Sequence, residues 1–234
     1  MSKSLKVVSI MQPYFLPYVG YWQLINLSDE FVILDDVNYR NRSWIARNKI
    51  LENNQSKLIN LQLVKASQNK KINEILIFGK KEKCFNTISN SYKKAPYYNS
   101  VISMLEKIIM NSELNLSNYL TYSIRLINEF LDLKATVTLS SNLKNSNNLS
   151  GEERIINICK SMNAGEYINV LSGSNLYDKS KFLDNSIRLK FLNTDIKPYN
   201  QNVKNFIPNL SIVDLLMFLP KDLIKIHLNS FKIV

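Results

Sequence analysis

The sequence predicts an α/β fold in which helices flank a parallel β-sheet and a helical insert interrupts the alternation. Two short apolar runs, at 5–11 and 31–37, enclose a helix-like segment at 17–27, which is the pattern of a βαβ unit. Apolar residues then recur at helical spacing, and strand-like and helix-like segments alternate again from 135. We therefore expect a single domain, 1–234, with a helical insert or cap at about 80–132.

The remaining elements follow in order along the chain. Residues 57–64 alternate apolar and polar side chains, which predicts a third strand. After the insert, 135–139 predicts a strand. Ser150 then begins a helix as its N-cap, with Glu153 at the capping-box position and Gly165 at the C-terminal cap. We expect strands at 167–171 and 187–191, the second being the last, and a helix at 211–218 that closes the core.

The composition is that of a globular protein, with 45% hydrophobic and 21% charged residues. No apolar stretch approaches the roughly 20 residues of a membrane-spanning helix, so we expect no membrane insertion. Cys84 and Cys159 lie far apart and lack metal-ligand spacing, which suits two buried thiols in a reducing compartment. We therefore expect a cytoplasmic protein that carries no metal and no cofactor.

The formal charge of +11 favours a polyanionic partner such as nucleic acid or nucleotide phosphates. A general bias toward Lys, Asn and Ile is the competing explanation. The arginines are more specific, because Arg40, Arg42 and Arg47 lie close to Tyr39 and Trp44. Guanidinium groups beside aromatic rings suit phosphate and base recognition, although a solvated basic loop has the same pattern.

Ligands of parallel sheets bind beyond the carboxyl ends of the strands, where we expect Gln12, Tyr14, Gly20, Asp35 and Asp36. Adjacent strand residues point to opposite faces, so only one aspartate can face a given pocket. That aspartate could act as a general base, hold a metal or bind a ribose hydroxyl. Capping of the following turn is the structural alternative.

Ser172, Gly173 and Ser174 follow a predicted strand and form a candidate anion-binding nest, although such turns also carry Gly and Ser for backbone reasons. The single histidine, His227, has no carboxylate or cysteine cluster near it in the sequence, so we interpret it as structural. Without it in the pocket, Ser-His-Asp and Cys-His catalysis are excluded. The aromatic residues of 14–22 are expected to form partly core and partly pocket wall.

Three segments together resemble the WbqC-like protein family, whose bacterial members are often encoded among genes for O-antigen and other lipopolysaccharide biosynthesis. They are Met11–Tyr21 (MQPYFLPYVGY), Asp35–Tyr39 (DDVNY) and Arg42–Asn48 (RSWIARN). Weaker support comes from Tyr92–Tyr97, Leu171–Tyr177 and Pro208–Asp214. The resemblance covers nearly the whole chain. It implies an enzyme that attaches an amino acid to the amino group of a deoxy amino sugar.

The opening segment is also similar to the strand–turn–helix start of nucleotidyltransferases and class I aminoacyl-tRNA synthetases. In those proteins a His-x-Gly-His pair stabilises charge at the α-phosphate. Here Tyr18 and Tyr21 stand on either side of Gly20 in place of the histidines, and tyrosine supplies no cation. The similarity therefore implies a Rossmann-like pocket shaped for a nucleotide or a tRNA 3′ end rather than adenylyl transfer.

The leading hypothesis is an aminoacyl transferase, an N-acyltransferase acting on a nucleotide-linked amino sugar, with aminoacyl-tRNA as the candidate donor. Its catalytic candidates are Gln12, Asp35 and Asp36, with one aspartate accepting the amine proton. Its substrate-binding candidates are Tyr14, Tyr18, Gly20, Tyr21, Tyr39, Arg42, Trp44, Arg47, Asn48, Ser172, Gly173 and Ser174. The alternatives are a non-enzymatic nucleotide-sugar-binding or scaffold protein and, third, a degenerate nucleotidyltransferase. The sequence leaves the sugar, the acyl group and the oligomeric state open.

These roles make one geometric prediction. Arg42 and Arg47 follow Asp36 by only a few residues, so their loop can fold back over its own strand end. If they bind phosphate, they should converge with Gln12 and with Asp35 or Asp36 on one cleft.

Overall fold

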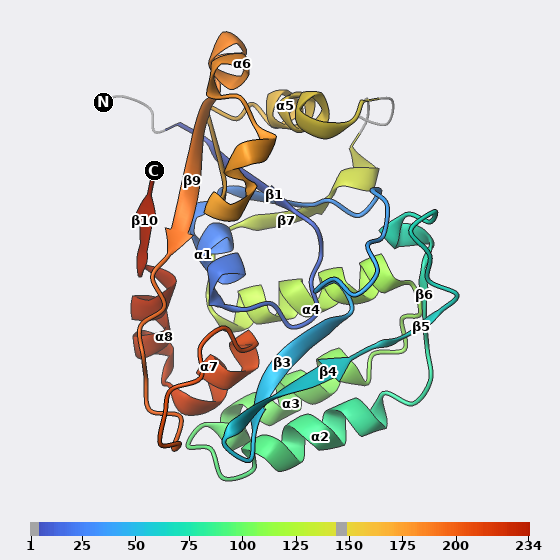
Figure 1. The fold of residues 1–234 in the computed structure, drawn as a ribbon, viewed down its shortest axis with the longest axis vertical. Helices are drawn as coiled ribbons and strands as arrows, with labels where there is room; N and C mark the ends of the chain where they lie inside the picture. Colours follow the sequence, from blue (N-terminus) through green and yellow to red (C-terminus); the bar gives the residue numbers. More distant parts are fainter. Residues whose placement is uncertain (1–4, 144–148) are drawn as a thin grey trace.

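A computed structural model describes residues 5–143 and 149–234 of the chain. Its centre is a six-stranded sheet with the order β10-β9-β8-β1-β2-β7 (Figure 1). The five strands from β9 to β7 run parallel, and β10 pairs with β9 in the antiparallel direction. The strands are β1 (Val7–Met11), β2 (Glu30–Ile33), β7 (Thr136–Leu139), β8 (Glu166–Val170), β9 (Arg188–Thr194) and β10 (Phe231–Ile233). The predicted α/β class with a parallel sheet is confirmed.

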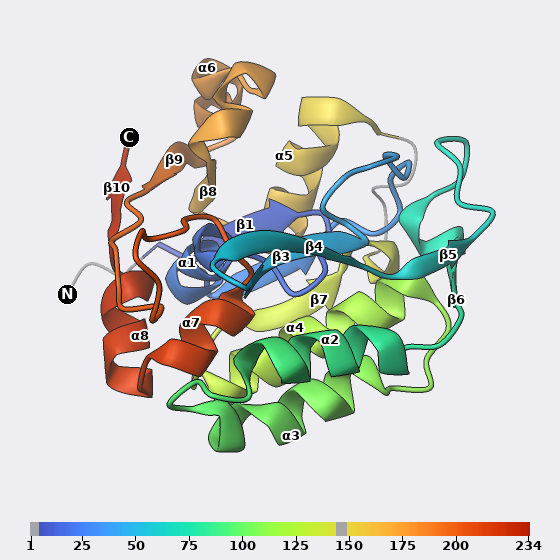
Figure 2. The ribbon, with the colours of Figure 1, turned by 60° about the horizontal axis from the view of Figure 1, so that its bottom comes forward.

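Helices cover both faces of the sheet, as Figures 1 and 2 show. Side chains of α5 and α6 share one buried apolar cluster with strand residues such as Val8 and Tyr167. The other face carries a larger cluster that includes α1, α4, α7 and α8. The helices are α1 (Val19–Leu27), α2 (Glu82–Tyr92), α3 (Tyr98–Ile109), α4 (Leu116–Phe130), α5 (Gly151–Ser161), α6 (Lys179–Asp184), α7 (Ile212–Phe218) and α8 (Lys221–Leu228).

The helical stretch expected at 80–132 contains α2, α3 and α4. Helix α4 contacts β7 directly, whereas α3 packs on α4 and α2 packs on α3 (Figure 2). The periodic apolar residues of α4, among them Leu120, Ile124 and Ile127, are fully buried. Helix α4 is therefore part of the layer that covers the sheet, and α2 and α3 extend that layer outward.

The predicted third strand, 57–64, is interrupted and lies outside the main sheet. Residues Gln55–Asn60 form β4, which pairs with β3 (Arg47–Glu52) as a hairpin, and Gln62–Val64 form β5, which pairs with β6 (Leu76–Phe78). Asn53 and Asn54 both have positive φ, as a two-residue hairpin turn requires. Between the two strands, Leu61 donates its backbone N–H to Ala46, which breaks the run. The alternating pattern therefore predicted strand conformation, but the structure has two short strands in separate two-stranded sheets in place of one.

Two details at α5 and one at β9 differ from expectation. Ser150 is the N-cap of α5, but its side chain makes no capping hydrogen bond. The left-handed residue after α5 is Asn163 (φ 56°) rather than Gly165. A Cβ on Gly165 would lie 2.7 Å from Leu5, so that glycine serves packing. Strand β9 is followed by β10, because the short C-terminal segment pairs on the outer edge.

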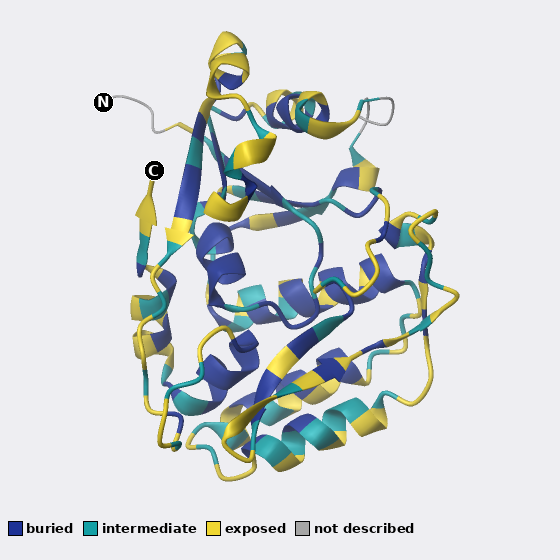
Figure 3. Ribbon diagram, viewed as in Figure 1, coloured by how far each residue is buried: buried dark blue, intermediate teal, exposed yellow. Residues whose placement is uncertain are grey.

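Two buried helices position the site. Helix α1 is buried from Val19 to Ile25, and α7 from Ile212 to Met217 (dark blue in Figure 3). The backbone N–H of Ile212 donates to the carbonyl of Pro17, and the N–H of Ser211 donates to Lys49 in β3. The start of α1, the start of α7 and the β3–β4 ribbon are thus held together.

Candidate functional site

A cavity of about 460 Å³ opens beyond the carboxyl ends of β1 and β8. These strands are neighbours in the sheet, and the chain leaves them in opposite directions across it. Such a switch point is the usual ligand site of open α/β sheets. The lining residues are Met11, Tyr14, Pro17, Tyr18, Tyr21, Trp44, Asn48, Lys49, Val170, Ser172 and Asn209. Six of the predicted substrate-binding residues are among them.

The turn between β1 and α1 forms the floor of the cavity, and side chains from two other segments hold it. Leu16 has φ 44°, a left-handed conformation that is strained for leucine. The Asn48 Nδ2 donates to the carbonyls of Phe15 and Leu16, both at 2.9 Å, and the Ser211 hydroxyl also donates to Leu16. Because both amide hydrogens of Asn48 are used, this residue supports the turn and leaves ligand contact to its neighbours.

Tyrosine rings form one wall of the cavity. Tyr14 and Tyr21 lie with ring centroids 5.6 Å apart, and the Tyr21 hydroxyl donates to the carbonyl of Gln12 at 3.1 Å. The pKa of Tyr14 is raised, first by burial and then by the neighbouring Tyr18, while Arg40 acts in the opposite direction. The Tyr14 phenol is therefore a protonated hydrogen-bond donor at neutral pH.

The mouth of the cavity is aromatic and cationic. Trp44 is 43% exposed, with the Arg47 guanidinium carbon 5.4 Å and the Lys49 amine 5.9 Å from its ring centroid. Helix α1 begins beside the cavity after Tyr18, which makes no side-chain cap, and the Tyr21 N–H donates to the Tyr18 carbonyl. The same region holds Arg40. Positive charge therefore gathers beside the tyrosine wall.

Asp35 lies at the carboxyl end of β2, as predicted, but its carboxylate faces a buried polar cluster rather than the cavity. It accepts hydrogen bonds from the Ser141 N–H (3.0 Å) and hydroxyl (2.8 Å), and from the hydroxyls of Ser140 and Ser117 (both 3.1 Å). The amide of Asn73 adds a contact at 3.3 Å. This geometry assigns Asp35 the task of joining strand ends and helix α4, and we do not retain it as the base.

Asp36 is equally committed to the protein interior. Its carboxylate pairs with the guanidinium of Arg154 on α5 and accepts from the Ser140 hydroxyl. Asp36 and Arg154 are each 7% exposed. A buried charge that already has a charged partner is a poor proton acceptor, so the role of base is not supported for Asp36 either.

The predicted convergence of Arg42 and Arg47 with Gln12 and an aspartate is not found. The backbone of Arg42 is left-handed (φ 56°), and its carbonyl accepts a hydrogen bond from the Arg47 guanidinium. Arg47 lies over Trp44, while Asp36 is paired with Arg154. Gln12 takes part through its backbone carbonyl and is not among the lining residues.

Two further candidates, Gly20 and Tyr39, lie near the cavity but support it indirectly. A Cβ on Gly20 would lie 2.5 Å from the Tyr18 hydroxyl and 2.5 Å from Thr194, so the glycine lets Tyr18 pack against α1. Tyr39 is buried, and Arg47 opposes the rise that burial causes in its pKa. Gly20 therefore acts through Tyr18, which lines the cavity, and Tyr39 acts through Arg47 at its mouth.

The predicted nest at 172–174 has a different backbone. Residues Leu171–Leu176 form a 3₁₀ helix, and the φ of Gly173 lies outside the left-handed region that a nest requires. Ser172 lines the cavity, whereas Gly173 is buried against Asn169. Ser174 accepts a backbone hydrogen bond from Tyr177. Only Ser172 keeps a place at the site.

Sequence reasoning missed the residues that close the cavity from the C-terminal side. Asn209 lines it, and Asp214 anchors the same segment as a fully buried carboxylate. Asp214 accepts from Tyr92 (2.9 Å), Gln201 (2.7 Å) and Tyr199. Burial raises the Asp214 pKa, although these hydrogen bonds oppose the rise. The signal was the 208–214 segment itself, which was noted as a motif but given no role.

Nucleophilic and metal chemistry lack a centre in the described residues. Burial raises the pKa of Cys84 to about 11 and that of Cys159 to about 12. His227 packs edge-on against Tyr199, with centroids 5.4 Å apart. Within 5–143 and 149–234 no three His, Cys, Asp or Glu side chains come together as a metal site, and none of the helices has the length and apolarity to cross a bilayer.

Comparison with known proteins identifies the family of the chain. The model of the WbqC-like protein family matches residues 12–226. The chain is 30% identical over 215 residues to the uncharacterized protein Rv1507c of Mycobacterium tuberculosis, an alignment that covers 91% of this chain and 93% of the relative. The comparison with solved structures gave no match.

Proposed function

The chain belongs to the WbqC-like protein family, and from this membership and its cavity we propose that it is an aminoacyl transferase. In this proposal it moves an amino acid from aminoacyl-tRNA to the amino group of a nucleotide-linked amino sugar for a surface glycan. The observation that carries the proposal is the tyrosine-walled cavity with cations at its mouth, placed at the switch point of the sheet.

The cavity suits a nucleotide sugar in size and chemistry. Its volume of about 460 Å³ lies within the range of small-molecule sites. Arg47 and Lys49 offer positive charge for the diphosphate, and Trp44 offers a flat face for a base or sugar ring. Ser172 supplies a hydroxyl group for the sugar.

The chemistry we propose depends on positioning and on one hydrogen-bond donor. The sugar amine attacks the carbonyl carbon of the aminoacyl ester, the bond from that carbon to the ribose oxygen breaks, and the amine proton leaves with the ribose oxygen. The Tyr14 phenol donates to the carbonyl oxygen as negative charge develops on it. Holding the two reactants together supplies the rest of the acceleration, so no carboxylate base is required.

The test combines purified protein, charged tRNA and candidate nucleotide amino sugars, with mass spectrometry of the sugar as the readout. We expect the mass of one aminoacyl group to be added. Tyr14→Phe should lower kcat about a hundredfold. Tyr122→Phe, a change of an exposed tyrosine on α4, is the matched control and should keep full activity. Absence of transfer from every charged tRNA, together with transfer from free amino acid and ATP, would contradict the donor.

A specific observation also favours the second candidate, a nucleotide-sugar-binding scaffold. The residues that line the cavity include no carboxylate, histidine or cysteine. In that case Tyr14→Phe would leave the glycan phenotype intact in cells, and no donor would give turnover, while nucleotide-sugar binding persisted in calorimetry.

A further inference from the structure

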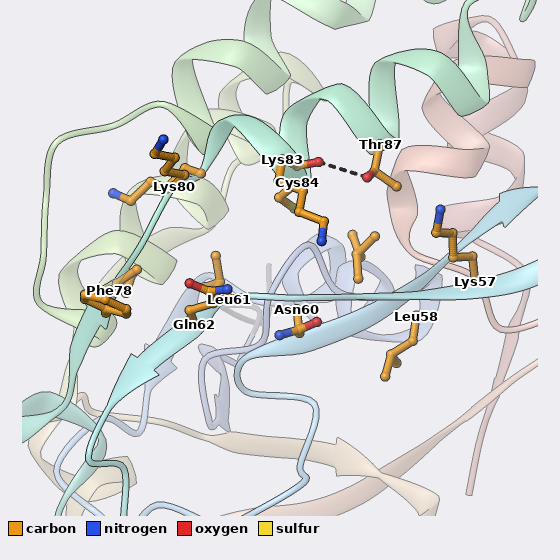
Figure 4. A pocket seen from close by; sticks show the side chains of 13 residues that line it. Lys57, Leu58, Asn60, Leu61, Gln62, Phe78, Lys80, Lys83, Cys84 and Thr87 are labelled. Carbon is orange, nitrogen blue, oxygen red and sulfur yellow. Dashed lines mark hydrogen bonds between the residues drawn. The ribbon is translucent and has the colours of Figure 1, made fainter.

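A second hollow, of about 430 Å³, lies between the edge of β4 and helix α2 (Figure 4). Among the described strands, β4 pairs only with β3, so its other edge forms one side of this groove. Lysines are the only charged residues among those that line it: Lys57, Lys80, Lys81 and Lys83. We call this hollow the lysine groove. Its chemistry selects for an anionic occupant.

Two of the four amines are already engaged within the protein. Lys57 pairs with Glu52 at 2.6 Å. Lys81 donates to the carbonyls of Asn111 and Glu113 and lies over the ring of Tyr119. Burial lowers the Lys81 pKa, which fits this fixed position.

The other two amines are available to a ligand. Lys80 and Lys83 form no ion pair within the described part of the chain. Figure 4 shows Lys83 extending from α2 toward β4, across the hollow. The groove therefore holds two uncompensated positive charges.

An exposed aromatic ring stands at one end of the groove. Phe78 on β6 is 65% exposed and pairs in register with Gln62 on β5. Leu58 on β4 is 47% exposed. A flat exposed ring beside lysines is the arrangement that binds single-stranded nucleic acid, because bases stack on the ring while amines contact phosphates. An acidic peptide would use the lysines but has no need of Phe78.

The lysine groove and the tyrosine-walled cavity are neighbours across the β3–β4 ribbon. Lys49, which lines the cavity, is paired in register with Leu58, which lines the groove. Arg47 is paired in the same way with Asn60. Directly opposed residues of an antiparallel pair project to the same side. From Lys49 through Leu58 and Gln62 to Phe78 the path is on the order of 20 Å, by standard strand spacings.

We propose that the lysine groove binds the single-stranded 3′ end of an RNA and leads it across the ribbon to the cavity. This inference rests on the proposed function, in which the donor is an aminoacyl-tRNA. Lys80 and Lys83 contact phosphates and Phe78 stacks a base, while the terminal nucleotide crosses the ribbon to the mouth of the cavity. The strand thereby brings its aminoacyl ester to the sugar amine.

Fluorescence anisotropy with two 5′-labelled RNA hairpins tests the groove without any chemistry. One hairpin carries a four-nucleotide single-stranded 3′ tail, and the other is blunt. We expect the tailed RNA to bind at least tenfold more tightly. Phe78→Ala should weaken binding of the tailed RNA about tenfold, the usual loss for one stacking platform, and leave the blunt RNA unchanged.

Charge reversal with a matched control tests the lysines. Lys80→Glu with Lys83→Glu should weaken tailed-RNA binding at least tenfold and reduce the slope of log affinity against log salt by about 1.4, the value for two phosphate contacts on a single strand. Lys107→Glu with Lys225→Glu makes the same change in net charge at exposed lysines of α3 and α8, and should cost less than threefold. Equal losses in the two variants, equal affinity for the two hairpins, or tighter binding of a polyglutamate peptide would overturn the proposal.

A small donor separates this inference from the proposed function. An aminoacyl ester of a dinucleotide can occupy the cavity without reaching the groove. The Lys80→Glu, Lys83→Glu variant should use this donor at the native rate while losing transfer from full aminoacyl-tRNA. Tail-specific RNA binding without transfer from either donor would contradict the proposed function and keep the groove. Transfer from both donors at native rates in the variant would contradict the groove and keep the function.

Discussion

The sharpest test of the site concerns Asp35, because its surroundings assign it a structural role where the sequence suggested a catalytic one. Its Oδ1 accepts from the Ser141 N–H and the Ser140 hydroxyl, and its Oδ2 accepts from Ser117, Ser141 and Asn73. Asparagine has the same shape but must turn an NH₂ group toward one of these two sets. An NH₂ in place of Oδ1 would face the Ser141 N–H, and an NH₂ in place of Oδ2 would face the Asn73 amide N–H. In either orientation two donors point at each other and one hydrogen bond is lost.

The expected cost follows from these contacts. A hydrogen bond to a charged group contributes about 1.5–3 kcal/mol, and an unsatisfied buried donor costs about 1–3 kcal/mol. Asp35→Asn should therefore lower the free energy of unfolding by about 2–4 kcal/mol, and Asp35→Ala by about 4 kcal/mol or more, which is at the exceptional end for a single substitution. For a chain of this size the asparagine variant should lose roughly 5–15 °C in Tm.

Urea unfolding followed by circular dichroism measures this difference directly. Asp132→Asn is the matched control and should change stability by less than about 0.5 kcal/mol, because within 5–143 and 149–234 the Asp132 carboxylate pairs with the exposed Lys221 alone, at 3.4 Å. A catalytic Asp35 would give the opposite pattern. If Asp35→Asn had the same urea midpoint of unfolding as the unmodified protein and yet lost all transfer activity, the structural assignment would be wrong.

The two thiols should be unreactive in the folded protein. With a pKa near 11, about one Cys84 thiol in a thousand is ionised at pH 8, and the ionised fraction of Cys159 is smaller still. Iodoacetamide should therefore modify both cysteines only after unfolding, which mass spectrometry measures. Desolvation lowers the His227 pKa below 6.5 in the folded protein. The neutral imidazole therefore contributes stability above pH 6.5, and this contribution should be lost as the pH falls through the folded-state pKa. In the His227→Gln variant, the urea midpoint of unfolding should decline less over this pH range. Gly20→Ala should displace Tyr18 and weaken nucleotide-sugar binding in calorimetry about tenfold, at a stability cost of about 1–3 kcal/mol.

The sequence predicted best where one physical signal dominates. The apolar run before Gln12 and the helical periodicity around Leu120 and Ile124 can each be buried in only one way, and both elements form as expected. The turn at Gln12–Tyr18 also lies at the predicted sheet edge, because a βαβ unit places it there. Local pattern and topology were sufficient for these features.

The errors occur where two distant segments compete for the same polar atom. The sequence shows Asp35 beside a strand end, but it does not show that Ser117 and Ser140 lie within hydrogen-bond reach of it. Likewise, the short spacing from Asp36 to Arg42 permits convergence, yet Arg154 on a distant helix takes the Asp36 carboxylate. Charge proximity along the chain therefore gave the wrong partners, and only the fold reveals the right ones.

The buried polar side chains next to the cavity hold the turn that positions its tyrosines. Asn48 and Ser211 donate to the carbonyl of Leu16 and so hold this residue at its strained φ of 44°. Such support fixes Tyr14 and Tyr18 at the cavity, whose lining residues include no carboxylate, histidine or cysteine. In the proposed transferase, such a site would gain rate by holding reactants in place rather than by moving protons. Removing the support, as in Asn48→Ala, should therefore reduce transfer and nucleotide-sugar affinity together, whereas Tyr14→Phe should reduce turnover alone.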